Sequence, residues 1–93
     1  MAGPIAAAMR AKLEAAFLPE RLEIVDDSAR HAGHAGAAGG GGETHFNVLI
    51  EAAAFNGLGR VARQRAVYAV LAEELAGPVH ALSVRVLGLG EVV

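Results

Sequence analysis

Hydrophobic residues recur with two different periods along this chain. Near its start they return about every four residues, which predicts one face of an amphipathic helix. Pro4 suits the first turn of that helix and Pro19 stops it. The apolar face consists of Ile5, Ala6, Met9, Leu13, Ala16 and Phe17.

Alternation of apolar and polar residues predicts three strands, over Leu22 to Asp26, Phe46 to Glu51 and Val79 to Leu87. The first two follow each other in sequence, so we expect them to pair antiparallel. Leu49 interrupts the alternation of the second strand and is expected to meet a neighbouring surface. In the last strand, Leu82, Val84 and Val86 share one face, while Ser83 and Arg85 occupy the other.

A turn over Phe55 to Gly59 and a long helix from about Arg60 to Ala76 are predicted between the second and third strands. The apolar stripe of this helix is Val67, Val70, Leu71 and Leu75. Glu73 and Glu74 would then lie near its C-terminus, where the helix dipole disfavours acids. The order of elements predicts an α+β domain, with three strands covered on one face by helices.

Composition narrows the class of protein. The 93 residues suit a single domain, 1–93, and the net charge of -2 weakens a nucleic-acid role. The absence of cysteine excludes disulfides and metal sites built on the chain's own thiolates. The start lacks a basic region typical of a signal peptide, and no run reaches the ~20 apolar residues of a membrane span. We therefore expect a cytoplasmic protein without a membrane contact.

A histidine- and glycine-rich segment separates the first two predicted strands. It contains His31 and His34 and four consecutive glycines, and His45 follows it. Little side chain is available for packing, so a flexible loop is expected over about 29–43. Such a loop is long for a hairpin connection. The fourth histidine, His80, comes much later in the chain.

Several segments together resemble the BolA family, in its order and spacing, from about Met9 to Val86. The most specific are Gly42-Glu43-Thr44-His45-Phe46 and Val79-His80-Ala81-Leu82-Ser83. The resemblance implies the fold αββααβ, a class II KH-like arrangement with a three-stranded sheet. One departure is Gln64, where the family commonly has a histidine between two arginines. The other matching segments are Leu22 to Ser28, Phe55 to Gly57, Arg63 to Tyr68 and Leu71 to Leu75.

This resemblance implies two roles. BolA-like proteins form heterodimers with monothiol glutaredoxins that share a [2Fe-2S] cluster, which links them to iron homeostasis. They have also been treated as DNA-binding transcriptional regulators of stress response and cell morphology. We expect the first role here, with DNA binding as the alternative.

The resemblance also assigns residues. His80 matches the family's histidine ligand, and a neutral imidazole is a suitable ligand for iron. The second family ligand lies in the loop, where either His31 or His34 could serve. His45 is expected to be structural, as a hydrogen-bond bridge to the loop or the last strand, with a ligand role as the alternative. Thiolates from a glutaredoxin cysteine and glutathione would complete the cluster, so none is expected in the isolated protein.

For the DNA-binding alternative, Arg60, Arg63 and Arg65 cluster at the start of the long helix. However, KH domains clamp the nucleic-acid backbone with a GXXG loop, and Gly57-Leu58-Gly59-Arg60 has a different spacing. A solvated helix face explains the arginines equally well. An enzyme is not expected, because Ser28 and Ser83 are the only serines and no nucleophile–base spacing is present.

Overall fold

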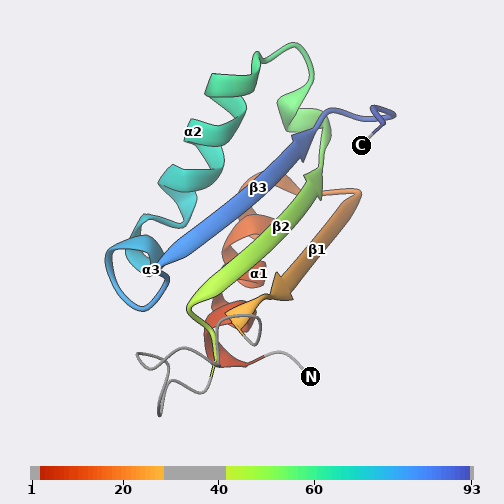
Figure 1. Cartoon of the computed structure of the whole chain (residues 1–93). Helices are drawn as coiled ribbons and strands as arrows, with labels where there is room; N and C mark the ends of the chain where they lie inside the picture. The colour runs from red at the N-terminus through yellow and green to blue at the C-terminus, as the bar shows by residue number, and fades with distance from the viewer. Residues whose placement is uncertain (1–2, 29–41, 93) are drawn as a thin grey trace.

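The computed structural model describes residues 3–28 and 42–92. Its three strands form one sheet in the order β1-β2-β3 (Figure 1). β1 pairs antiparallel with β2, and β2 pairs parallel with β3, so the segment between them crosses over one face of the sheet. The elements in order are α1 Pro4–Phe17, β1 Arg21–Asp26, β2 His45–Glu51, η3 Ala53–Phe55, α2 Arg60–Val70, α3 Ala72–Ala76 and β3 Ala81–Leu87.

The first helix follows its sequence pattern closely. Pro4 occupies its first turn, and Leu18 ends it in a left-handed conformation just before Pro19. A proline at this position leaves no N–H to satisfy, which favours a helix start. Ala6, Met9 and Leu13 are buried, whereas Ala16 is exposed, contrary to the predicted apolar face. The next residue, Phe17, packs against Phe55, so Ala16 lies on the side of the last turn that faces solvent.

The core lies between the helices and one face of the sheet. Phe46, Val48 and Ile50 of the central strand are almost completely buried. The register aligns Val48 and Ile50 with apolar residues of both neighbouring strands, and Phe46 with an apolar residue of β3, and these partners pack against the same core. The alternation therefore predicted which face of each strand turns inward, and the α+β fold with αββααβ order is confirmed.

The prediction of one long helix over Arg60 to Ala76 is wrong in one respect, because the structure has two helices that are separated at Leu71. This residue has φ -100° and ψ 18°, and it separates α2 from α3. Its side chain is fully buried, so the apolar stripe continues across the break and periodicity does not reveal it. Glu73 and Glu74 consequently lie in the first turn of α3, where the helix dipole no longer opposes them.

The last strand begins at Ala81 and not at Val79 as predicted. The backbone N–H groups of His80 and Ala81 both donate to the carbonyl of Thr44, so the chain turns into the sheet at this point. Val79 is buried before the strand starts. The predicted flexibility of 29–43 falls mainly on residues 29–41, which lie outside the described residues. Within the described part of the chain, no helix is long and apolar enough to cross a membrane.

Candidate functional site

His45 and His80 lie side by side where the second and third strands begin. Their ring centroids are 6.4 Å apart, and the ring planes differ by only 11°. His45 is the first residue of β2, and its register partner is Ala81, the residue after His80. The parallel pairing of β2 and β3 therefore brings together two histidines that are 35 positions apart in the sequence.

The backbone around His80 is held from both sides while its side chain is exposed. The His80 N–H donates to the Thr44 carbonyl over 2.8 Å, and the Val79 N–H donates to the Glu74 carbonyl over 3.0 Å. Val79 is 3% exposed and anchors the segment in the core. His80 thus presents its imidazole to solvent from a fixed backbone position.

His45 is half-buried and takes part in a local polar network. Its Nδ1 lies 2.8 Å from the hydroxyl oxygen of Thr44, and its backbone N–H donates to the hydroxyl oxygen of Ser28. The side chain of His45 thus contacts its neighbour Thr44, and its predicted bridge to the loop or the last strand stays a prediction.

The chain is pinned on both sides of residues 29–41. The Asp26 carboxylate accepts the N–H groups of Ser28 and Glu43, each over 2.9 Å. The Ser28 hydroxyl, followed by these backbone groups, holds the pKa of Asp26 below its usual value. The Thr44 N–H donates to the Ser28 hydroxyl oxygen, and a Glu43 carboxylate oxygen accepts the N–H of Ala6 in α1. Residue 28 and residue 44 are therefore fixed beside the two histidines.

The predicted ligands can now be placed. His80 and His45 are brought together, while His31 and His34 lie outside the described residues. Imidazole nitrogens are common ligands for iron, zinc and copper. Within residues 3–28 and 42–92, no group of three or more histidine, aspartate or glutamate side chains is arranged to hold a metal ion. The described part of the site thus offers two adjacent imidazoles and no complete ligand set.

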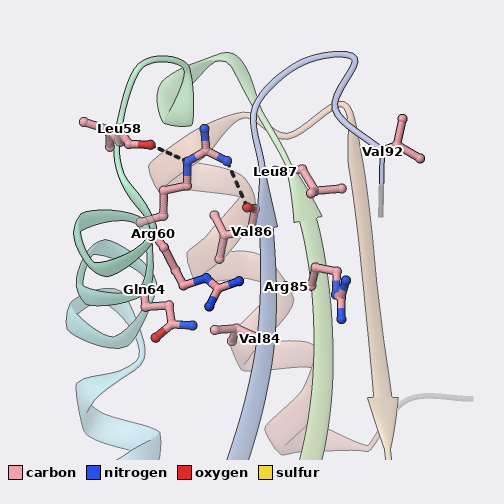
Figure 2. A pocket seen from close by; sticks show the side chains of 9 residues that line it. Leu58, Arg60, Gln64, Val84, Arg85, Val86, Leu87 and Val92 are labelled. Carbon is pink, nitrogen blue, oxygen red and sulfur yellow. Dashed lines mark hydrogen bonds between the residues drawn. The ribbon is translucent and has the colours of Figure 1, made fainter.

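A second candidate site is a groove of about 590 Å³ between α2 and β3 (Figure 2). Arg60, Arg63 and Gln64 reach it from the helix, and Arg85 reaches it from the strand. Arg65 does not line it, although the sequence grouped it with Arg60 and Arg63. Sequence reasoning missed Arg85 as a member of this group. Its position on the polar face of the last strand was the available signal.

Arg63 forms hydrogen bonds and an ion pair with other residues of the chain. Its guanidinium donates to the carbonyls of Leu58 and Val86, the two hydrogen bonds drawn as dashed lines in Figure 2. It also donates to both carboxylate oxygens of Glu91, over 2.6 and 2.9 Å. The Arg63 guanidinium, assisted by the Gly88 backbone, lowers the pKa of Glu91 to about 2. Arg63 therefore fixes the C-terminal residues to the fold, and Arg60 and Arg85 make no ion pair with another described residue.

Comparison with known proteins gives a consistent result. The family model for BolA-like protein matches residues 13–91. The chain is 49% identical over 84 residues to BolA-like protein 1 of Mus musculus, covering 90% of this chain and 58% of that protein. It is 42% identical over 80 residues to the DNA-binding transcriptional regulator BolA of Escherichia coli, covering 86% of this chain and 71% of that protein. The chain thus spans less than two thirds of the mouse relative.

The fold comparison points the same way. The BolA domain of SufE1 from Arabidopsis thaliana superposes with a TM-score of 0.86 at 40% identity, covering 99% of this chain and 100% of that domain. The name of the Escherichia coli relative describes a regulator and not an enzyme, in line with the expectation from the sequence.

Proposed function

This chain belongs to the BolA-like protein family, and we propose that it shares a [2Fe-2S] cluster with a monothiol glutaredoxin, using His80 as one ligand. The observation that carries this proposal is the placement of His80. Its imidazole is exposed, its backbone is fixed to Thr44, and it lies beside His45. A ligand on a fixed backbone is positioned at a lower entropic cost than one on a mobile backbone.

The chemistry of the donor set fits a shared cluster. A [2Fe-2S] cluster takes four ligands besides its own sulfides, which are usually thiolates, and imidazoles replace two of them in some proteins. This chain has no cysteine, so it can contribute imidazoles only. The remaining ligands must come from elsewhere, and the thiolates of a glutaredoxin cysteine and of glutathione suit that need. When bound, a cluster with imidazole ligation has a higher reduction potential than one with thiolates alone.

The second imidazole is proposed to come from His31 or His34. Both belong to the segment whose two sides are pinned by Asp26 and Ser28 next to His45. His45 itself is the alternative, because its ring lies 6.4 Å from that of His80. These contacts place residues 28 and 43–45, which flank that segment, on the same side of the domain as His80.

Cluster sharing is tested by mixing the purified chain with a [2Fe-2S]-loaded monothiol glutaredoxin and glutathione. Visible absorption, circular dichroism and size-exclusion chromatography are followed together. We expect a one-to-one complex with a cluster spectrum unlike that of the glutaredoxin alone. The His80→Ala variant should lose that spectral change, whereas single His31→Ala and His34→Ala variants identify the second ligand.

A conservative replacement separates ligation from a structural role. His80→Cys supplies a thiolate in place of the imidazole, so we expect the complex to form with a different spectrum and a lower cluster potential. A spectrum that is the same for the original chain, His80→Ala and His80→Cys would reject His80 as a ligand.

DNA binding is the second candidate function, and the arginine-lined groove is the observation that favours it. Arg60 and Arg85 lie in this groove without ion-pair partners among the described residues. Free guanidinium groups of this kind bind phosphates. The name of the Escherichia coli relative adds support, while the net charge of -2 argues against strong binding.

The salt dependence of binding to duplex DNA tests this candidate. If Arg60 and Arg85 contact phosphates, each alanine variant should reduce the slope of log K against log salt by about 1. Arg21→Ala is the matched control, because Arg21 is exposed on the opposite edge strand and pairs with Glu23. Equal slopes for the original chain and the two groove variants would exclude the groove as the contact.

A further inference from the structure

The face of the sheet turned away from the core is not covered by any described helix. Figure 1 shows this face toward the viewer, with α1 behind the sheet. This face includes two apolar side chains that are not buried. Leu49 is partly exposed at the middle of the central strand, and Val25 is 53% exposed on β1. A shallow depression of about 360 Å³ includes both residues. Leu49 is the same residue that breaks the alternation in the sequence.

The strand register places Leu49 between two opposite charges. Glu23 on β1 and Arg85 on β3 are both direct register partners of Leu49. Because the strand order is β1-β2-β3, the three side chains form a straight row, acid–leucine–base, across the sheet. On one side of it lies an uncharged row, Val25, Asn47 and Ser83, and on the other side lies the row Arg21, Glu51 and Leu87.

This row is complementary to itself under one particular symmetry. A two-fold axis parallel to β2 and above Leu49 lays β1 of one copy over β3 of the other. Each Glu23 then faces the Arg85 of the second copy, and the two Leu49 side chains meet on the axis. An axis perpendicular to the strands would instead set Glu23 against Glu23, which is repulsive. The charges of this row therefore favour the axis parallel to β2, in which the strands of the two sheets run in the same direction.

We propose that this chain forms a symmetric dimer by stacking the open faces of two sheets, with Leu49 at the centre and Glu23 paired with Arg85 of the second copy. The side chains of Arg85 and Glu23 are available for these contacts. Among the described residues, Arg85 has no ion-pair partner, and Glu23 pairs only with the exposed Arg21 of its own strand. The dimer is independent of the proposed cluster sharing, because it uses neither His45 nor His80.

The size of the face determines how strong the dimer is. Strands spaced about 4.8 Å apart and rising about 3.3 Å per residue give each copy on the order of 300 Å² of sheet face. Stable specific interfaces use about 800 Å² per partner. At the end of the sheet near Glu51 the contact is limited further, because the same axis sets Glu51 against Glu51 of the second copy. Glu51 also accepts the backbone N–H of Gly90 there. The dimer is therefore weak, and it forms at high protein concentration.

Sedimentation equilibrium over a wide range of protein concentrations at low salt tests the dimer. The average mass should rise from 9.5 kDa toward twice that value. Glu23→Arg and Arg85→Glu each convert two attractive contacts into two repulsive ones, so each should lower the association constant about tenfold or more. Leu49→Asp should abolish association. Val61→Asp is the matched control, because Val61 is 59% exposed on α2, away from the sheet face.

The two-fold symmetry also predicts how the two charge-reversal variants behave together. A mixture of the Glu23→Arg and Arg85→Glu variants should form a heterodimer, because both contacts between positions 23 and 85 are then attractive. The double variant carrying both changes should regain self-association. An association constant that is unchanged by the charge reversals would overturn the proposal, since another surface would then be responsible. A chain that stays monomeric at all concentrations, but loses glutaredoxin binding in Leu49→Asp, would also overturn it and assign the face to that partner.

Discussion

The hydroxyl oxygen of Ser28 lies 2.9 Å from the backbone nitrogen of Thr44. The same oxygen also accepts the backbone N–H of His45 over 3.1 Å. Ser28 is only 7% exposed, so these donors would find little water in its absence. One buried side chain thus joins the end of the first strand region to the residues that hold His45 and the backbone of His80.

We expect Ser28→Ala to destabilise the fold by about 1–3 kcal/mol, because two partly buried N–H groups lose their acceptor. Urea denaturation measures this difference, and amide exchange at His45 should accelerate. Ser83→Ala provides the matched control, since Ser83 is the only other serine and is exposed on β3. Equal midpoints for the two variants would show that the Ser28 hydroxyl has no such role.

Lys12, the chain's only lysine, connects α1 to α3. Its ammonium group lies 2.7 Å from carboxylate oxygens of both Glu73 and Glu74. The Glu74 side chain is 8% exposed, and its other oxygen, Oε1, is buried without a hydrogen-bond partner among the described residues. Lys12→Met would leave this carboxylate buried without a cation, which is strongly unfavourable.

Thermal unfolding should therefore show a much larger decrease in melting temperature for Lys12→Met than for Glu73→Gln, because the Glu73 side chain is 86% exposed. The double variant Lys12→Met with Glu74→Leu should recover most of the loss, since an apolar pair can replace a buried ion pair. A double variant no more stable than Lys12→Met would indicate that Lys12 acts in another way.

The ion pair between Arg63 and Glu91 makes the C-terminal residues sensitive to acid. The pKa of Glu91 is lowered from 4.5 to about 2, chiefly by the Arg63 guanidinium. A depressed pKa means that the pair stabilises the fold above pH 4.5, and that this contribution is lost as the pH falls from 4.5 toward 2. An NMR titration of the Glu91 carboxyl carbon should give a midpoint near 2. In Arg63→Ala the midpoint should return toward 4.5, and a midpoint near 4.5 in the original chain would contradict the pairing.

Local patterns predicted most of the fold. Period-four and period-two spacing located the first helix and the inward faces of all three strands, because these patterns depend on which side of an element is buried. The break at Leu71 was not predictable in this way. Leu71 keeps its place in the apolar stripe although its backbone leaves the helical conformation.

The candidate site could be predicted only in part. The sequence identified His80 and His45 separately, but their proximity depends on the parallel register of β2 and β3, which a single sequence does not specify. The arginine group was similarly incomplete, because Arg85 joins Arg60 across the α2–β3 groove and not along the helix. Contacts between segments that are distant in sequence depend on tertiary packing, and local sequence patterns do not predict them.

Ligation of the shared cluster by His80 is tested most directly by pulsed electron paramagnetic resonance. The chain is labelled with nitrogen-15 in its histidines, mixed with an unlabelled, cluster-loaded glutaredoxin and glutathione, and the cluster is reduced. We predict nitrogen-15 couplings to the cluster, with the coupling of His80 lost in His80→Ala while the fold stays intact. A spectrum without nitrogen-15 coupling, or with the same couplings in His80→Ala, would contradict the proposed role of His80.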